Sequence, residues 1–335
     1  MRLRVATFNV EDLDEPRPGG VPLDDRIAVL RPQLLALRAD VLCLQEVSAH
    51  VRHDGRRSLR ALDQLVEGTP YAAFARATSR APSGGPSDKH NLVVLSRLPI
   101  IAEHQHLHDV VAPPIVRLTT TPQPRDEHVR WDRPILEVHL ALPDGRPLVV
   151  FDAHLRAPLA ANIEGAKLAP LVWRTTEGWA EGYLLAAIKR TGQALELRRH
   201  IDRVFDTDGD ARILVAGDLN ADVTDAAYRI LRANVEDTGN PALAGRSLVA
   251  LEDRIAEANR YTVVHGGRRL LLDHLLASPA LAVCCVDAAS LNEGLPDESQ
   301  LEAAHVAPVG SLHAPLVAEL ELPDRATAPA APARR

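Results

Sequence analysis

The stretch Ile213-Leu214-Val215-Ala216-Gly217-Asp218-Leu219-Asn220 is the most informative part of this chain. Its four leading apolar residues form a short uninterrupted run bounded by a glycine, which is typical of a buried strand. A carboxylate and a carboxamide, Asp218 and Asn220, follow directly. Functional sites are commonly built where the strands of a rigid scaffold end. The stretch therefore predicts a buried strand that carries two chemically useful side chains to one edge of a sheet.

Five other strand-like runs share this pattern of apolar residues beside a carboxylate, a carboxamide or an imidazole. Outward from the first stretch along the chain, they carry Asp152 with His154, Asp273 with His274, Glu46, His313 and Asn9. Any one of these is more often a turn cap or a satisfied buried polar group. Six together, drawn from the whole chain, indicate one composite site.

The remaining pattern of apolar residues predicts the fold. Ten short runs bounded by turn residues are expected to be strands: residues 4–10, 40–45, 91–96, 135–142, 147–153, 212–216, 261–264, 270–277, 282–287 and 314–322. Asp144-Gly145 lies between two of them and is a strong hairpin signal. Helical spacing covers residues 24–37, where Pro32 should kink or restart the helix, and residues 58–67 and 179–205. Antiparallel strands interleaved with helices predict an α+β domain of two packed sheets with helices outside.

Two details of this prediction can be checked directly. Segments 76–90 and 108–133 are expected to be surface loops, because they are rich in proline, glycine and polar residues. The helix at 179–205 is expected to turn one apolar face inward: Tyr183, Leu184, Ala187, Ile188, Leu195, Ile201 and Phe205.

Composition limits the classes of function. The net charge of -7 provides no general attraction to nucleic acid or anionic membranes, although it leaves local basic grooves open. Three cysteines cannot form a disulfide framework, and no signal peptide or long apolar segment is recognisable. We therefore expect a monomeric cytoplasmic protein with one domain over residues 1–322, and a disordered Pro/Ala-rich tail over residues 323–335.

These residue types suit the hydrolysis of a phosphate ester, whose negative oxygens repel a nucleophile. A divalent cation bound by a carboxylate such as Glu46 would neutralise that charge. Asp218 could orient or deprotonate the attacking water, while Asn220 positions the water or the phosphate. An imidazole beside the phosphoryl oxygens would stabilise the transition state, and a carboxylate would keep it charged. His313 with Asp273 is the candidate pair.

The motifs together resemble the endonuclease/exonuclease/phosphatase superfamily, which includes pancreatic-type deoxyribonucleases, abasic-site endonucleases, sphingomyelinases and inositol-polyphosphate phosphatases. The resemblance covers residues 3–322, and each motif is weak alone but the ordered set is specific. The motifs are Thr7-Phe-Asn-Val-Glu-Asp-Leu, Asp40-Val-Leu-Cys-Leu-Gln-Glu46, Asn91-Leu-Val-Val-Leu-Ser-Arg97-Leu-Pro-Ile, Gly217-Asp-Leu-Asn220, Leu272-Asp-His-Leu-Leu-Ala-Ser278 and Ser311-Leu-His-Ala-Pro-Leu.

The resemblance implies a four-layer α/β/β/α sandwich, in which two mostly antiparallel sheets pack face to face with helices outside. It also implies Mg²⁺ or Mn²⁺ as the cofactor and a site at one edge of the paired sheets. Asn9 resembles the first-motif asparagine near the metal and the phosphate, and Glu46 resembles the metal-binding glutamate. His154 resembles the phosphate-contacting histidine of the deoxyribonuclease branch.

Catalytic roles follow from the same resemblance. Asp218 and Asn220 match the Asp-x-Asn pair that handles the nucleophile, and Asn220 is also expected to contact the phosphate. Asp273 is similar to the aspartate that orients the final histidine, and His313 is similar to that histidine. His274 occupies a position that usually points away from catalysis, so we assign it a structural role.

The last motif departs from the family, which normally has Ser-Asp-His where this chain has Ser311-Leu312-His313. Leu312 cannot bind a cation, so we expect a weaker metal site, a site completed by another carboxylate, or a site that relies on Glu46 alone. Asp12 and Asp152 are the substitutes suggested by sequence position. The alternative function is therefore that of a catalytically impaired member that acts as a binding module.

The identity of the phosphate ester stays open at this stage. The motif features of the inositol-phosphatase branch are missing, and sphingomyelinases are usually exported. A nuclease would prefer basic loops, which four segments could supply, although surface charge is the simpler interpretation of each: residues 52–57, 189–190, 198–199 and 266–269. The insert that carries Trp173 and Trp179 is the expected source of selectivity, and its aromatic residues suit a core as well as base stacking.

Overall fold

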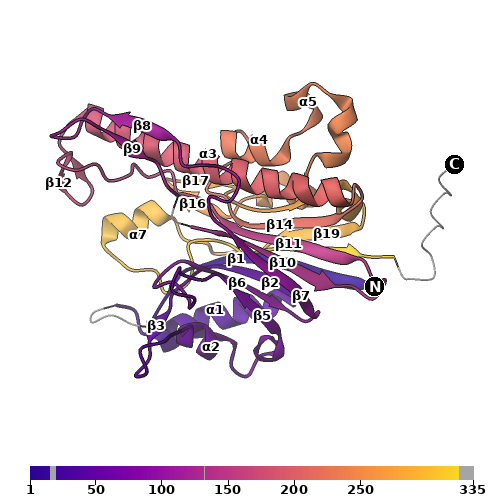
Figure 1. The fold of residues 1–335 in the computed structure, drawn as a ribbon. Coiled ribbons are helices and arrows are strands. Elements are labelled where there is room, and N and C mark those ends of the chain that lie inside the picture. Colours follow the sequence, from indigo (N-terminus) through magenta and orange to yellow (C-terminus); the bar gives the residue numbers. More distant parts are fainter. Residues whose placement is uncertain (16–19, 132, 324–335) are drawn as a thin grey trace.

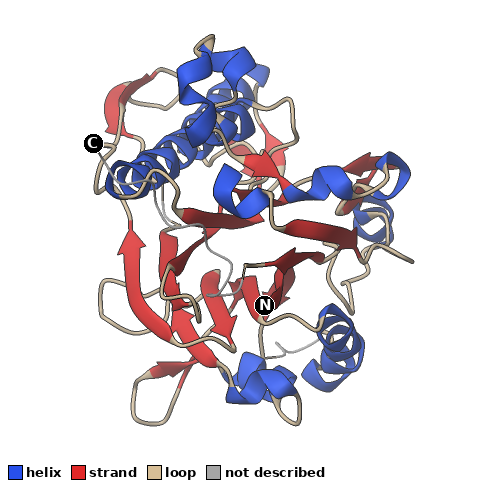
Figure 2. Ribbon diagram, turned by 90° about the vertical axis from the view of Figure 1, so that its right-hand side faces the viewer, coloured by secondary structure: helices blue, strands red, loops and turns tan. Residues whose placement is uncertain are grey.

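The computed structural model describes residues 1–15, 20–131 and 133–323, and folds them into four layers. Two six-stranded sheets pack face to face, α1 and α2 cover the outside of one, and α3 and α4 cover the outside of the other (Figures 1 and 2). The predicted α+β class and the four-layer arrangement are confirmed. The predicted tail lies outside the described residues except for Pro323. No helix within the described ranges is long and apolar enough to cross a membrane.

The first sheet contains the strands that carry Asn9 and Glu46. Its order is β19-β20-β1-β2-β6-β5, and only β1 and β2 pair in parallel. The strands are β1 (Arg2–Leu13), β2 (Val41–Val47), β5 (Ala75–Thr78), β6 (Asn91–Ser96), β19 (Cys285–Ser290) and β20 (Leu316–Glu321). Its outer face packs against α1 (Leu23–Leu37) and α2 (Arg60–Val66).

The second sheet carries His154, Asp218 and Asp273. Its order is β15-β18-β14-β11-β10-β7, and only β11 and β14 are parallel. The strands are β7 (Ile100–His106), β10 (Ile135–Ala141), β11 (Pro147–His154), β14 (Arg212–Asp218), β15 (Val249–Ala250) and β18 (Asp273–Ala277). Strands β10 and β11 pair from Ile135 with Ala153 to Ala141 with Pro147, so the predicted hairpin is confirmed. Helices α3 (Thr176–Thr207) and α4 (Ala226–Arg232) cover the outer face.

Each space between layers has its own apolar core, because successive strand residues face opposite sides. Val5, Cys43, Val138 and Leu214 are among the residues that fill the space between the sheets. The α1/α2 core and the α3/α4 core are separate clusters. A fourth cluster lies under the N-terminal half of α3 and joins this half to the loops around it. The edge of the sheets is therefore the place where polar side chains can gather.

Smaller elements decorate this frame. Four two-stranded ribbons are β3 (His50–Val51) with β4 (Arg57–Ser58), β8 (Ile115–Leu118) with β9 (Arg125–His128), β12 (Lys167–Ala169) with β13 (Val172–Trp173), and β16 (Val263–His265) with β17 (Arg268–Leu270). The short helices are α5 (Val235–Thr238), α6 (Pro279–Ala282) and α7 (Glu298–Ala304), and the 3₁₀ turns are η1 (Pro70–Ala73), η2 (Pro241–Arg246), η3 (Leu251–Arg254) and η4 (Glu257–Asn259).

Several local expectations were wrong. Helix α1 continues through Pro32 as one element instead of restarting there. Strand β7 was not predicted, because its sequence is polar and its position at the sheet edge exposes most of it. Strands β5, β8 and β9 lie in segments expected to be loops. The buried face of α3 also differs from the predicted one. Tyr183, Leu184 and Leu195 are at least 40% exposed, whereas Ile201 and Phe205 are buried as expected.

Candidate active site

Three candidate residues lie side by side on adjacent strands of the second sheet. His154 at the end of β11 pairs in register with Asp218 at the end of β14, and Asp218 pairs with Asp273 at the start of β18. Strand β18 is antiparallel to β14, so its first residue lies at the same sheet edge as the last residue of β14. A polar residue at a strand end is therefore informative only together with the direction of that strand.

Gly217 makes the close approach of β14 to β11 possible. Its φ is +145°, and a Cβ built there would lie 1.9 Å from the carbonyl oxygen of Ala153. Glycine is the residue that tolerates both this conformation and this contact. Gly217 thus allows β14 to lie close to β11, which places Asp218 beside His154.

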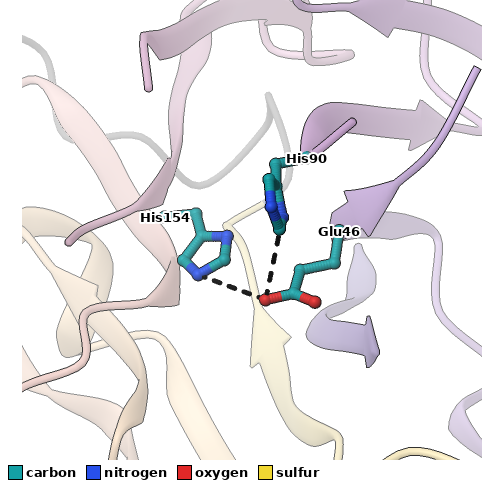
Figure 3. A group of neighbouring side chains, drawn as sticks. All are labelled: Glu46, His90 and His154. Atoms are coloured by element: carbon teal, nitrogen blue, oxygen red, sulfur yellow. Dashed lines mark ion pairs between the residues drawn. The ribbon is translucent and has the colours of Figure 1, made fainter. Parts of the chain in front are cut away.

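A bulge in β2 aims Glu46 into the same edge. The register between β2 and β6 shifts between Leu44 and Val47, and Glu46 adopts a φ of +63°. The Asn91 side chain stabilises the bulge, because its amide donates to the carbonyl oxygen of Val47 at 2.8 Å. In Figure 3, Glu46 extends from its strand toward His90 and His154. Its Oε1 lies 3.6 Å from Nε2 of His154 and 4.0 Å from Nδ1 of His90.

Asp218 is the hub of the arrangement and is 2% exposed. Its Oδ2 accepts hydrogen bonds from the side-chain amides of Asn9 at 3.1 Å and Asn220 at 3.0 Å, and it lies 3.3 Å from Nε2 of His154. Burial opposes ionisation, but His313 and His154 outweigh it and hold the pKa of the Asp218 carboxyl well below its usual range. Asp218 is therefore a carboxylate at neutral pH.

His313 faces Asp218 from the other sheet, at the loop that precedes β20. Its Nδ1 lies 2.8 Å from Oδ2 of Asp273, and its Nε2 lies 4.0 Å from Oδ2 of Asp218. Burial works against the charged ring, but Asp273 and Asp218 raise the pKa of His313 well above its usual value. The structure thus holds an imidazolium whose Nε2 edge points into the site.

Both sheets contribute side chains to the site. One imidazole nitrogen, Nε2 of His154, is within 4 Å of both Glu46 and Asp218, although these carboxylates belong to different sheets. The structure therefore brings together all seven residues predicted to form the site, Asn9, Glu46, His154, Asp218, Asn220, Asp273 and His313. Their catalytic roles stay predictions.

Two further residues of this site were missed in the sequence. His90 is the residue just before β6, and because β6 is antiparallel to β2, the start of β6 lies beside the end of β2. Glu11 follows Asn9 by two positions, and burial raises its pKa to about 7, with His313 lowering it and Glu46 raising it. The sequence signal for His90 is a histidine directly before the strand-like run 91–96.

Backbone strain is concentrated around these residues. Glu11, Asp12, Glu46, His90 and Asn220 all have positive φ values between 45° and 63°. Such conformations are unfavourable for residues with a Cβ and are retained where surrounding contacts enforce them, often at functional sites. Five such residues within one site indicate that the contacts of their side chains outweigh the conformational cost of positive φ values.

The two carboxylates suggested as substitutes for the usual aspartate do not enter the site in the same way. Asp152 is fully buried between the sheets, where Gln45 donates to its Oδ1 at 2.7 Å, and burial raises its pKa well above the usual value. Neither group of metal-ligating side chains that the described residues form at this edge includes Asp152 or Asp12, so both substitutes stay predictions. Asp12 is half exposed, with Oδ1 4.0 Å from Nδ1 of His90.

A clamp around Arg26 of α1 holds the end of β1 and the loop before the last motif together. Its guanidinium donates to the carbonyl oxygens of Val10 and Asp12 within the first motif, and of Val309 and Gly310 before the last. Ser311 adds a second link, since its hydroxyl donates to the carbonyl oxygen of Asn9 at 2.7 Å. The position of His313 relative to Asn9 therefore depends on buried polar contacts.

His274 lies on the other side of β18. Its Nδ1 lies 2.7 Å from Glu252 and its Nε2 2.9 Å from the carbonyl oxygen of Ala221, and the ring is fully buried. These contacts agree with the structural role expected for this residue.

Metal-ligating groups gather at two places in this site. Glu46, His90 and His154 form one group, and Asp218, Asp273 and His313 form the other. Nδ1 of His90, Nδ1 of His154 and Oδ1 of Asp273 are buried without a hydrogen-bond partner. Buried polar atoms are nearly always paired, and an ion or its waters is one explanation for those that are not. The donor set therefore fits a divalent cation.

Comparison with known proteins agrees with this geometry. Residues 6–293 match the model of the Endonuclease/Exonuclease/phosphatase family, and His313 lies beyond the matched range. No curated protein matches. The solved structures that match include a mannosyl-6-phosphatase from Bacteroides thetaiotaomicron VPI-5482 (TM-score 0.58, 14% identity, 96% of this chain and 100% of that one). An AP endonuclease from Archaeoglobus fulgidus (0.53, 17%, 96% and 100%) and the human Nocturnin catalytic domain (0.54, 15%, 96% and 94%) match similarly. At these identities the likeness concerns the fold.

Proposed function

We propose that this chain, which belongs to the Endonuclease/Exonuclease/phosphatase family, is a phosphate ester hydrolase that requires a divalent cation. The observation that carries the proposal is the convergence on Asp218 of two amide donors and two histidines, beside the separate carboxylate of Glu46. Negative charge would be concentrated in this arrangement when a phosphate ester binds. The positive groups are positioned to compensate for it.

The residues that would hold the cation are Glu46 and Glu11, with the side-chain oxygen of Asn9 nearby. Carboxylate and amide oxygens suit Mg²⁺ or Mn²⁺, whereas a set of imidazoles alone would favour other metals. Oε1 of Glu46 stands 3.6 Å from His154, a spacing too long for a strong hydrogen bond. When bound, the cation would neutralise the phosphate charge and polarise the ester.

The residues of this chain would perform the remaining steps. Asp218 is a carboxylate of low pKa, so it orients the attacking water but is a weak base for the proton of that water. Asn9 and Asn220 hold that carboxylate in place. His313 donates a charged hydrogen bond to the phosphoryl oxygen from Nε2, because Asp273 engages Nδ1. His154 provides a second contact at the phosphate.

The basic segments considered in the sequence differ in how their arginines are used. Arg190 and Arg198 are more than 90% buried, and Arg198 is paired with Asp202 and with backbone carbonyls. Arg57 lies 3.6 Å from Asp88. The buried guanidinium groups of Arg190 and Arg198 cannot also contact a phosphate backbone, whereas Arg52, Arg56, Arg268 and Arg269 are exposed. Both a small phosphate ester and a nucleic acid are therefore compatible with the observations, and a substrate panel distinguishes them.

Hydrolysis of p-nitrophenyl phosphate and bis-p-nitrophenyl phosphate with Mg²⁺ tests the proposal. We expect turnover of at least one of the two, and a loss of roughly 100-fold or more in kcat for Asp218→Asn, since the orienting charge is removed. Asp222→Asn is the control, because this partly exposed aspartate accepts a hydrogen bond from the backbone N–H of Val223 in the following turn. If the parent protein cleaves neither ester, nor any in a panel of nucleotides, sugar phosphates, lipids, DNA and RNA, then the chain is a binding module.

A further inference from the structure

A second cluster of histidines and carboxylates lies on the opposite face of the second sheet. His106 at the end of β7 stacks on His200 of α3, with ring centroids 3.6 Å apart. Glu137 of β10 pairs in register with Phe151, which belongs to the core under α3, and it touches His106. Side chains alternate along β11, so His154 faces the other way, into the site between the sheets. The two clusters are therefore separate.

The ligand atoms of this cluster converge. His106, Asp109 and His200 each offer one atom, and the three atoms lie within 4.8 Å of one another. Nδ1 of His106 lies 2.9 Å from the carboxylate of Asp109. The backbone N–H of Asp109 donates to Glu196 of α3 at 2.6 Å, which holds the loop after β7 against the helix. The three groups thus come from β7 with the loop after it and from α3, and a hydrogen bond already joins this loop to the helix.

The other nitrogen of His106 is occupied by a carboxylate. Its Nε2 lies 2.7 Å from Glu137, and Glu137 also touches Nε2 of His139 at 2.6 Å. Histidine ligands of metal ions typically donate their second ring N–H to a carboxylate in this way, which fixes the ring and raises its basicity. Glu137 is therefore placed as an orienting residue behind His106.

An unsatisfied nitrogen points to a missing ligand. His200 is 4% exposed, and its Nε2 is buried without a hydrogen-bond partner. A cavity of about 440 Å³, lined by His104, His106, Glu137, His139 and His200 among others, opens beside it and admits small solutes.

We propose that His106, Asp109 and His200 form a second metal site, which binds a transition-metal cation of the Zn²⁺ class with water as a further ligand. Two imidazoles and one carboxylate suit Zn²⁺ and disfavour Mg²⁺, which prefers oxygen donors. Bound metal joins the edge strand β7 to the C-terminal half of α3.

Zinc binding by the full chain in a large excess of Mg²⁺ tests the site, because Mg²⁺ competes at the oxygen-rich site between the sheets and not here. Equilibrium dialysis with metal analysis should find one Zn²⁺ per chain in the parent protein. His200→Phe keeps the ring stack and removes the nitrogen, so we expect roughly 100-fold weaker binding, and Glu137→Gln should weaken it about 10-fold. Two control variants should bind Zn²⁺ like the parent: Glu46→Gln in the site between the sheets, and His128→Asn at an exposed histidine.

Asp109→Asn serves as the variant that leaves the buried stack intact, because its side chain is 45% exposed. It should weaken Zn²⁺ binding and abolish the rise in Tm that Zn²⁺ gives the parent protein. Circular dichroism of each variant verifies the fold. The proposal is overturned if the parent retains no Zn²⁺ under these conditions, or if His200→Phe and Asp109→Asn bind it as tightly as the parent.

Discussion

At the scale of single residues, the charge state of His313 is the property on which the proposed chemistry depends most. Its pKa is raised because Asp273 and Asp218 outweigh the effect of burial. A raised pKa means that the imidazolium is present at neutral pH and is lost only as the pH rises through that higher value. The alkaline limb of the pH–rate profile should therefore lie well above 6.5.

Asp273→Asn tests this assignment. The amide removes the charge that raises the pKa of His313 while burial continues to lower it, so the alkaline limb of kcat/KM should move to lower pH. Glu252→Gln is the matched control, because Glu252 contacts the structural His274 at 2.7 Å on the other side of β18, close to the 2.8 Å between Asp273 and His313. The pH profile of that control should keep its limb. An unchanged limb in Asp273→Asn would remove His313 from the mechanism.

Variants of Leu312 and Glu11 test which residue replaces the aspartate that the family's last motif normally has. Leu312 is 8% exposed, and Glu11 is the acidic residue whose charge interacts with both His313 and Glu46. Glu11→Gln should raise the Mg²⁺ concentration for half-maximal rate about 10-fold or more, and Leu312→Asp should partly reverse this in the double variant. Asp12→Asn should change it little. If Glu11→Gln titrates like the parent and Asp12→Asn does not, Asp12 is the substitute.

At the scale of elements, strand ends were predictable because buried apolar runs and the polar residues after them are local features of the sequence. The β2 bulge, the positive φ values and the pairing of β6 with β2 are not local. They depend on contacts such as Asn91 with Val47. This is why Glu46 could be predicted and His90 could not. Edge strand β7 was missed for the same reason, since the pairing that makes it a strand leaves no apolar pattern.

The Arg26 clamp gives a prediction at this scale. Arg26→Lys keeps the charge but loses the planar fork that reaches two carbonyl oxygens at the end of β1 and two in the loop before the last motif. We therefore expect kcat/KM to fall roughly 10-fold and stability to fall by about 2 kcal/mol. Arg31→Lys is the control, because Arg31 on the same helix also donates to carbonyl oxygens, but those of Gln64 and Leu65. The two variants are compared by denaturant unfolding and by steady-state kinetics. Equal losses of activity would show that the clamp has no special effect on the site.

At the scale of the whole molecule, the number and order of layers followed from the sequence, while the contacts between layers did not. Strand length, the Asp144-Gly145 hairpin and helical spacing are enough to predict two sheets with helices outside. The shared placement of polar residues at strand ends predicted that they form one composite site. The resemblance to a family added that this site lies at one edge of the paired sheets. No local pattern shows that His154 and Asp218 from one sheet contact Glu46 and His313 from the other.

The central claim is that residues from both sheets hold a cation that hydrolysis requires. The rate of bis-p-nitrophenyl phosphate hydrolysis, followed through chelation by EDTA and back-titration with Mg²⁺ or Mn²⁺, tests it most directly. We predict that EDTA abolishes the rate, that either ion restores it, and that Glu46→Gln needs about 10-fold more metal for the half-maximal rate. A rate that persists unchanged in excess EDTA would contradict the account.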